Sequence, residues 1–181
     1  MGRGAGGGGR SGGGGDGTSA SALSDSETSA LTFYKEEGYS DINSALRNGE
    51  EYDSEIINPI DSAIANSETT RDLVLYRGAS PDLIDQMSEG EVFNDLGYTS
   101  TTRNINTAED FGIEFGRNTV MEIHVPKGSN ALHLDRAIEA ARDEKEYLLP
   151  RNSNFRIRSI ETIRDNNGKI YQYYVVADYE K

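Results

Sequence analysis

Two glutamates one residue apart, Glu144 and Glu146, are the residues of this chain best suited to do chemistry. The apolar run that begins at the second of them predicts a β-strand over residues 146–150. If the strand starts at Glu146, alternation places both glutamates on one side and Lys145 on the other. Two carboxylates that face one space titrate apart, so one can stabilise positive charge while the other transfers a proton. Taken alone, the same pair also fits an exposed acidic turn before a strand.

A second pair of residues suited to a functional site follows an earlier apolar run. Residues 73–76 predict a short buried strand, and Arg77 and Gly78 come directly after it. An arginine can donate two hydrogen bonds to phosphate oxygens, and a glycine lets a ligand approach the backbone. Without other signals, Arg77 could equally face solvent before the turn that residues 78–81 predict.

The third group is rich in hydroxyls. Residues 97–102 predict an extended segment that carries Ser100, Thr101 and Thr102. By itself this segment is also typical of an edge strand made of good β-formers.

In their order and separation, the three segments resemble the arginine–serine–glutamate (R-S-E) class of mono-ADP-ribosyltransferases. That class has an arginine on an early core strand, an S-T-S-like segment, and an E-x-E motif directly before a strand. The matching residues are 75–78, 100–102 and 144–151, and the resemblance covers about residues 25–179. Thr102 stands where the family usually has serine, while Ser100 is retained.

The resemblance implies NAD as co-substrate and assigns roles to single residues. Arg77 would bind the NAD phosphates, Gly78 would present backbone groups to the nicotinamide amide, and Ser100 would hydrogen-bond Glu146. The residues it implies for NAD binding are Arg77, Gly78, Ser100, Thr101, Phe111, Phe115, Arg117 and Glu146, and the catalytic residues are Arg77, Ser100, Glu144 and Glu146.

The two glutamates would divide the reaction between them. The resemblance implies that Glu146 binds the nicotinamide-side ribose and stabilises the positive charge that develops as nicotinamide leaves, which a fixed carboxylate does best in a dry cleft. An arginine acceptor has a pKa above about 12, so a second carboxylate, Glu144, would orient it and help remove its proton. In this family, glutamate at the first E-x-E position goes with arginine acceptors, so Glu144 favours arginine.

An aromatic side chain after the hydroxyl segment packs against nicotinamide in this family. Phe111 and Phe115 are the two candidates, and nearby Arg117, which could contact phosphate, slightly favours Phe115. Either phenylalanine could instead be a core residue. His124 and His133 receive no functional role.

Composition narrows the class of protein further. The 181 residues carry a net charge of −13. This charge disfavours nonspecific binding to nucleic acids or anionic membranes, because binding their phosphates requires a cationic surface. The chain has no cysteine and two histidines, so we expect no metal centre, and no apolar run approaches the roughly 20 residues of a membrane span. We expect a protein that is secreted or delivered into a target-cell cytoplasm, with a target protein and, if it is a toxin, an immunity protein as partners.

The order of predicted elements indicates an α+β fold. Residues 1–22, almost all glycine, serine and alanine, predict a flexible linker, and residues 23–181 predict the catalytic domain. Helices are expected from 24 to about 67, with Gly38 ending the first, and strands follow, closed by a hairpin whose loop spans 165–168. The resemblance implies a helical lobe and a two-sheet core around an NAD cleft.

Three other functions remain open at this level. The same cleft could transfer ADP-ribose to water, as an NAD glycohydrolase, or the fold could serve as a catalytically idle module that binds NAD or another protein. A glycosidase with paired carboxylates is less compatible, because side chains two residues apart on one strand do not reach opposite faces of a sugar ring.

Overall fold

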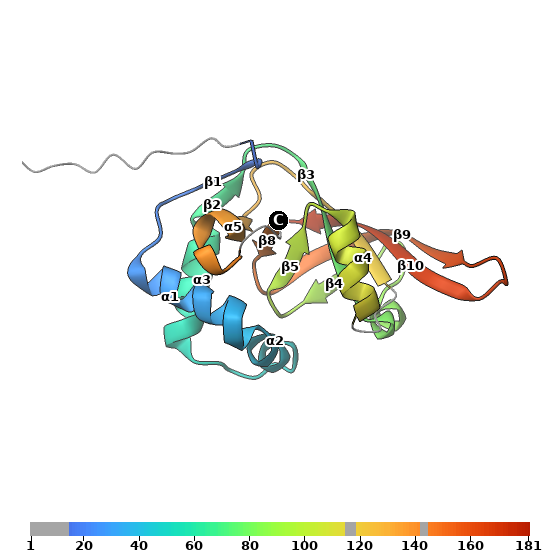
Figure 1. The fold of residues 1–181 in the computed structure, drawn as a ribbon, viewed down its shortest axis with the longest axis horizontal. Coiled ribbons are helices and arrows are strands. Elements are labelled where there is room, and N and C mark those ends of the chain that lie inside the picture. The colour runs from blue at the N-terminus through green and yellow to red at the C-terminus, as the bar shows by residue number, and fades with distance from the viewer. Residues whose placement is uncertain (1–14, 115–118, 142–144) are drawn as a thin grey trace, which may run out of the picture.

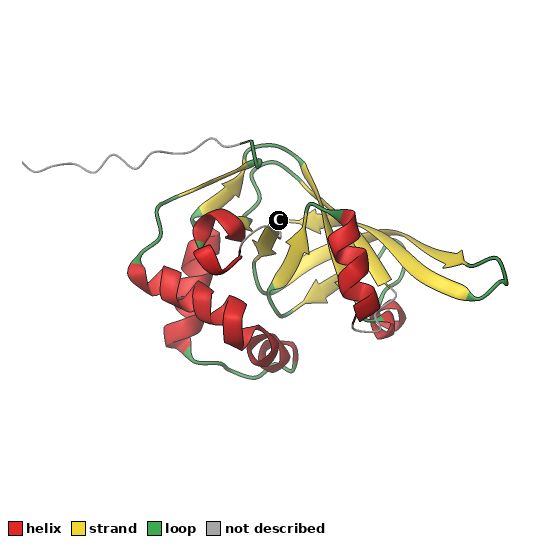
Figure 2. Ribbon diagram, viewed as in Figure 1, coloured by secondary structure: helices red, strands yellow, loops and turns green. Residues whose placement is uncertain are grey.

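The computed structural model describes residues 15–114, 119–141 and 145–181. Figures 1 and 2 show helices α1 to α3 gathered on one side of the molecule and a sheet on the other, from which the β9–β10 hairpin projects. The expected α+β class is therefore confirmed, with a helical lobe followed by strands.

The helical lobe is nearly continuous from residue 25 to residue 47. It comprises α1 (Asp25–Phe33), a π-helical turn η1 (Tyr34–Gly38) and α2 (Tyr39–Arg47), followed by α3 (Ser54–Ala65). Ser24 and Glu27 form a capping box that starts α1. The prediction that Gly38 ends the first helix is wrong, because Gly38 keeps right-handed helical angles. A Cβ there would lie 2.5 Å from the Phe33 ring, so glycine provides room for packing at the π turn.

The sheet contains most of the remaining chain. Its strands are β3 (Leu73–Ala79), β4 (Val92–Asp95), β5 (Thr99–Thr102), β6 (Thr119–Val125), β7 (Leu132–His133), β8 (Glu146–Leu149), β9 (Ser153–Arg164) and β10 (Ile170–Glu180). Between them lie η2 (Pro81–Gln86), α4 (Ile105–Glu114), α5 (Leu134–Ala137) and η3 (Glu139–Ala141). The strand order is β4-β9-β10-β6-β3-β5-β8-β7, with β10 and β6 parallel and every other pair antiparallel.

The junction between β3 and β5 differs from the rest of the sheet. The two strands share one register pair, Tyr76 with Thr102, and then separate. The expected two-sheet core is thus one hydrogen-bonded sheet whose two parts meet at a single pair. Beyond this pair, Arg77 and Gly78 lie on one side of the separation, and Ser100 lies on the other.

Strand β8 borders both hydrophobic cores. Leu148 belongs to the core under the helical lobe, whereas Tyr147 and Leu149 belong to the core of the main sheet. All three side chains are at most 1% exposed. Alternation along β8 therefore explains why this strand is a continuous apolar run instead of an alternating one.

The chain joins the fold earlier than expected. β1 (Thr18–Ala20) pairs with β2 (Ser67–Thr69), and Asp16 is largely buried against the domain. The prediction of a flexible linker up to residue 22 is therefore wrong for residues 16–20. The small side chains of these residues give no hydrophobic signal. The residues of β1 pair with β2 through backbone hydrogen bonds, which amino-acid composition does not predict.

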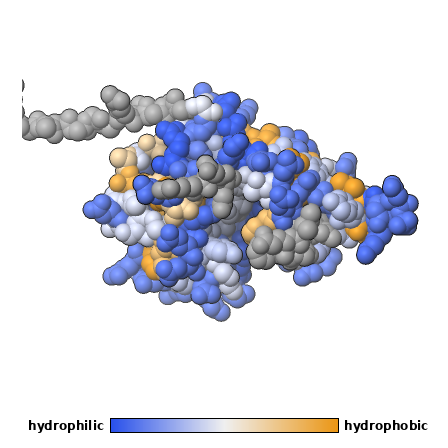
Figure 3. Space-filling view, in the orientation of Figure 1, coloured by the Kyte–Doolittle hydropathy of each residue, from blue (hydrophilic) through white to orange (hydrophobic). Residues whose placement is uncertain are grey.

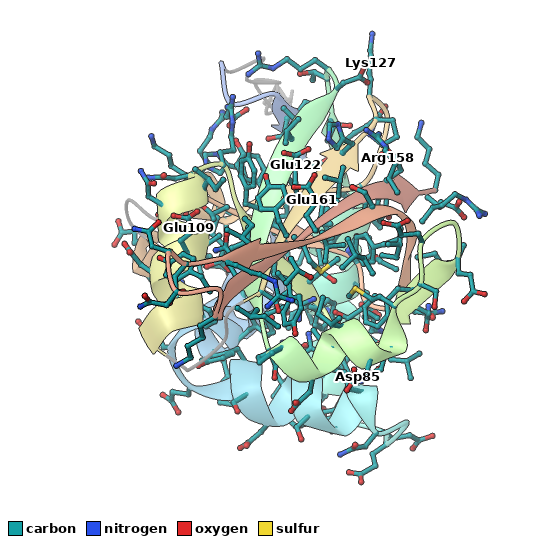
Figure 4. All side chains as sticks on the ribbon, turned by 90° about the vertical axis from the view of Figure 1, so that its right-hand side faces the viewer. Asp85, Glu109, Glu122, Lys127, Arg158 and Glu161 are labelled. Atoms are coloured by element: carbon teal, nitrogen blue, oxygen red, sulfur yellow. The ribbon has the colours of Figure 1, made fainter. Side chains whose placement is uncertain are left out.

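The molecular surface is predominantly polar. Figure 3 shows a mostly hydrophilic face with small, separate hydrophobic patches. Figure 4 shows Glu122, Glu161 and Arg158 on one side of the sheet and Asp85 far from them on η2. Within the described ranges, no helix is long and apolar enough to cross a membrane.

Candidate active site

Glu146 is the first residue of β8 and is held by its neighbour strand. Thr102 is its register partner on β5, and Ser100 lies two residues further along the same strand. The Ser100 hydroxyl donates a hydrogen bond of 2.9 Å to Oε2 of Glu146, as the resemblance implied. Glu146 is 7% exposed, so its carboxylate lies in a site with restricted access to water.

Lys35 contacts the other oxygen of the same carboxylate. Its Nζ lies 2.7 Å from Oε1 of Glu146, and the two side chains are 19% and 9% exposed. Lys35 lies on the π turn η1 of the helical lobe. Sequence reasoning missed this residue, because a lysine 111 positions before its partner carries no local signal.

The backbone before Glu146 does not continue as a strand. Lys145 has a φ of 48°, which is left-handed, so the alternation expected from Glu144 to Glu146 does not apply. Its N–H donates to Oδ2 of Asp135 at 2.6 Å, and the N–H of Glu146 donates to Oδ1 at 3.1 Å. Glu144 itself lies outside the described residues.

The guanidinium of Arg77 pairs with the buried carboxylate of Asp95, which also pairs with Arg47. Asp95 Oδ2 accepts a hydrogen bond of 2.7 Å from Arg77 Nη1, and Oδ1 accepts one of 2.9 Å from Arg47 Nε. The Gly97 N–H and the Thr99 hydroxyl also donate to Asp95, which is 4% exposed. Sequence reasoning missed Asp95, since an aspartate at the end of a short strand has no distinguishing pattern.

Burial and charge act in opposite directions on this network. Burial alone would raise the pKa of Asp95, but the charge of Arg77 and hydrogen bonds from Arg47 hold that pKa below its usual range. Burial lowers the pKa of Arg77, and Asp95 partly offsets this effect. Because an arginine pKa starts far above neutrality, both groups stay ionised near pH 7.

Tyr34 links the two sides of the candidate site. Its hydroxyl accepts a hydrogen bond of 2.8 Å from Asn43, and its ring meets Tyr98 edge to face with 5.7 Å between centroids. Burial raises the pKa of Tyr34. Lys35, the next residue, binds Glu146, and Arg47 on the same lobe binds Asp95, the partner of Arg77, so the helical lobe contacts both parts of the candidate site.

Gly78 has a different reason for being glycine than the one expected. A Cβ on Gly78 would lie 2.5 Å from the backbone oxygen of Ala108 and 3.1 Å from the nitrogen of Gly112, both on α4. Close packing of helix α4 on strand β3 thus requires the glycine, whereas the expectation was close approach of a ligand.

Replacing Gly78 with alanine should destabilise the fold by about 1–3 kcal/mol, because α4 must shift away from β3. A thermal melt followed by circular dichroism measures the change. Gly15 is a matched control, since a Cβ there meets no atom within 4 Å. Equal melting temperatures for Gly78→Ala and Gly15→Ala would contradict this account.

Of the other residues expected to bind NAD, the structure describes Thr101 and Phe111. The Thr101 hydroxyl donates a hydrogen bond of 2.7 Å to the carbonyl of Tyr147, and the side chain is 3% exposed, so the geometry makes Thr101 a link between β5 and β8 instead of a cleft residue. Phe111 lies on α4 and is 38% exposed. Phe115 and Arg117 lie outside the described residues.

His133 has partners that the sequence did not reveal. Its Nδ1 lies 2.9 Å from Oδ2 of Asp16, and its ring stacks on Tyr147 with 4.6 Å between centroids. Arg136 Nη1 donates to the same Asp16 oxygen at 2.6 Å. These contacts link His133 to the start of the chain and to β8, and none of them reaches Glu146 or Arg77.

A groove elsewhere in the molecule contains none of these residues. It has a volume of about 820 Å³ and lies between α1 and α3, next to Phe33 and Pro59. Among the described residues, no group of three or more histidine, aspartate and glutamate side chains could hold a metal ion. The candidate site is therefore defined by the carboxylate of Glu146 and the Arg77 network.

Comparison with known proteins identifies the family. The family model described as ADP-ribosyltransferase exoenzyme matches residues 17–178, which is most of the chain. The chain belongs to the ADP-ribosyltransferase exoenzyme family. Among solved structures, the C3 exoenzyme of Clostridium limosum superimposes with a TM-score of 0.70 at 25% identity, over 88% of this chain and 87% of that one. The observed α+β architecture is therefore that of the ADP-ribosyltransferase toxins.

Two further ADP-ribosyltransferases or exoenzymes are similar to this chain. NAD(+)–arginine ADP-ribosyltransferase EFV of Enterococcus faecalis is 28% identical over 151 residues, which is 78% of this chain and 30% of that protein. Exoenzyme S of Pseudomonas aeruginosa, solved with human 14-3-3 protein beta and Carba-NAD, has a TM-score of 0.70 at 25% identity over 86% of this chain and 74% of that one. The chain thus spans about 30% of the length of the curated relatives it matches.

Proposed function

We propose that this chain is the catalytic domain of an enzyme that transfers ADP-ribose from NAD to an arginine side chain of a target protein. The supporting observation is the Ser100–Glu146 hydrogen bond of 2.9 Å on one side of the β3–β5 separation, with Arg77 on the other. A fixed carboxylate and a buried cation on the two sides of this separation support an NAD-binding cleft between them. NAD offers both the pyrophosphate that a cation binds and the glycosidic bond whose cleavage develops positive charge.

Glu146 acts on the bond that breaks. The bond joins C1 of the ribose to the nicotinamide nitrogen, and nicotinamide leaves with the electron pair, so positive charge develops on the ribose. A carboxylate that is held in advance stabilises this charge without reorganising. Ser100 and Lys35 hold one oxygen each, at 2.9 and 2.7 Å, so the Glu146 rotamer is set before NAD binds.

The acceptor arginine then forms the new bond to C1. Its guanidinium nitrogen attacks, and the proton that it releases goes to a nearby base, the role we assign to Glu144. The pyrophosphate is held by Arg77, whose guanidinium is ordered by Asp95 at 2.7 Å. Gly78, Phe111, Phe115 and Arg117 remain proposed NAD contacts on the strength of the family resemblance.

Changing Glu144 to glutamine should separate the two half-reactions. Because glutamine cannot accept the guanidinium proton, we expect arginine modification to fall at least about 100-fold while NAD hydrolysis changes less than about threefold. Nicotinamide release and transfer of labelled ADP-ribose to agmatine, a small arginine analogue, measure the two reactions. Equal loss of both would contradict the proposed division of roles.

Two alternatives are tested with labelled NAD and a cell lysate. Label that stays on protein after denaturation supports covalent transfer. If excess agmatine in the reaction lowers this labelling by competing as the acceptor, the acceptor is arginine. Release of nicotinamide with neither protein nor agmatine labelled would favour an NAD glycohydrolase. NAD binding in a calorimeter with no nicotinamide released would favour an idle binding module.

The cellular setting is part of the proposal. The relatives include a protein named secreted exoenzyme S and the toxin AexT of Aeromonas salmonicida. We infer a toxin or effector that is secreted or delivered into a target cell and modifies a protein in its cytoplasm. An immunity protein that covers the cleft stays a prediction from the sequence.

A further inference from the structure

The carboxylate of Asp135 contacts the backbone next to Glu146 from outside the R-S-E motif. It accepts the N–H of Lys145 on one oxygen and the N–H of Glu146 on the other, at 2.6 and 3.1 Å. We propose that Asp135 is a positioning residue for the transfer reaction, because it holds the backbone turn from which the Glu146 side chain enters the cleft. This inference rests on the function proposed above.

The turn needs such support because Lys145 is in an unfavourable conformation. Its φ of 48° is left-handed, which costs roughly 1–2 kcal/mol for a residue with a Cβ. Hydrogen bonds from backbone N–H groups to an ionised carboxylate are stronger than neutral ones and offset that cost. On the other side, the carbonyl of Lys145 accepts a hydrogen bond of 3.2 Å from the N–H of Arg103. Without Asp135, Lys145 is free to relax toward an extended conformation, and Glu146 rotates with it.

Asp135 is itself held by its flanking residues. Leu134, the residue before it on α5, is fully buried in the core under the helical lobe. Arg136 and His133, on either side, both bind Asp16 through the contacts of 2.6 and 2.9 Å described above. The position of Glu146 therefore depends on a series of contacts that begins at Asp16, close to the glycine-rich start of the chain.

The central test is Asp135→Asn. Asparagine keeps the shape of the side chain but places an amide NH₂ against one backbone N–H, so the turn loses one of its two hydrogen bonds. We expect kcat for nicotinamide release to fall about 10- to 100-fold, as small misplacements of catalytic groups do, with KM for NAD within about twofold. Asp85→Asn is the matched control, because Asp85 is exposed on η2, an element that contributes no residue to the turn at Lys145 (Figure 4).

Substitutions at Lys145 test the cause of that loss. Glycine adopts positive φ without a steric cost, whereas valine strongly disfavours it. We expect Lys145→Gly to keep activity within about threefold and Lys145→Val to lower kcat about tenfold or more. In the double variant Asp135→Asn/Lys145→Gly, we expect at least about a threefold recovery over Asp135→Asn alone.

Each result decides the question. Activity of Asp135→Asn equal to that of Asp85→Asn, a rise in KM with kcat unchanged, or no recovery with glycine would overturn the inference. If Asp135→Asn does not fold, equal kcat for Lys145→Gly and Lys145→Val would overturn it instead. Wild-type protein that neither releases nicotinamide nor labels protein would refute the proposed function and this inference with it, whereas an active wild type with an active Asp135→Asn would refute the inference alone.

Discussion

Glu146→Gln should lower both nicotinamide release and protein labelling by about 10²- to 10³-fold, because removing one preorganised charge-stabilising group has an effect of that size. Glutamine has the same shape: its oxygen can still accept from Lys35, and its NH₂ can donate to the Ser100 hydroxyl, so the site should largely keep its geometry. What it loses is the negative charge opposite the developing positive charge on the ribose. Quantifying nicotinamide release at saturating NAD measures the effect on kcat.

Glu161→Gln is the control for that experiment. Glu161 is exposed on β9, a strand that carries none of the candidate site residues (Figure 4). We expect its kcat to stay within about twofold of the wild type, as is usual for surface substitutions. A Glu146→Gln variant that retains a tenth or more of the wild-type rate would remove Glu146 from the mechanism.

The largest expected effect on stability comes from Asp95→Ala. Removing one partner of a buried ion pair costs about 3–5 kcal/mol, because the remaining charge stays buried without compensation. Here the remaining charge is Arg77, whose side chain is 14% exposed and which lies 2.7 Å from Asp95. For a domain of this size, the melting temperature should fall by roughly 6–20 °C. Circular dichroism on heating measures this fall.

Asp178→Ala provides the comparison. Asp178 pairs with Arg158 at the surface, where the side chains are 41% and 53% exposed, so its loss should leave the melting temperature nearly unchanged. Replacing Arg77 with methionine in the Asp95→Ala background should recover part of the loss, because it removes the unpaired charge. Similar melting temperatures for Asp95→Ala and Asp178→Ala would show that burial of this pair does not matter.

Acid should reduce the difference between wild type and Asp95→Ala. The pKa of Asp95 is lower in the folded protein than its ordinary value of 3.8. A carboxyl group of this kind contributes stability above its unfolded pKa and loses that contribution as pH falls through the folded value. The two melting temperatures should therefore converge well below pH 3.8.

Sequence reasoning worked where the signal was local. Apolar runs and turn residues located β3, β8 and the β9–β10 hairpin, whose predicted loop forms with the Asp165 N–H donating to the Lys169 carbonyl at 2.8 Å. The contact between Ser100 and Glu146 followed from the family resemblance, and the structure contains it. Each of these depends on a few neighbouring residues with a strong pattern.

It failed where distant residues decide the outcome. Lys35, Asp95 and Asp135 have ordinary local sequences, and only the fold brings them to Glu146 and Arg77. Gly38 was assigned from a local rule as a helix stop, but it makes room for the Phe33 ring, and the packing of α4 against Gly78 was not foreseen either. A glycine shows that a side chain is absent at its position, but the sequence does not show which residues pack into that space.

Because both hydrophobic cores share β8, the catalytic strand cannot open by itself. Its three apolar side chains contact the helical lobe on one face and the main sheet on the other, so releasing β8 exposes both cores at once. Amide hydrogens of β8 should therefore exchange with solvent only through global unfolding. A partly folded form of this domain would lack Glu146 in place, so enzymatic activity becomes an all-or-none report of complete folding.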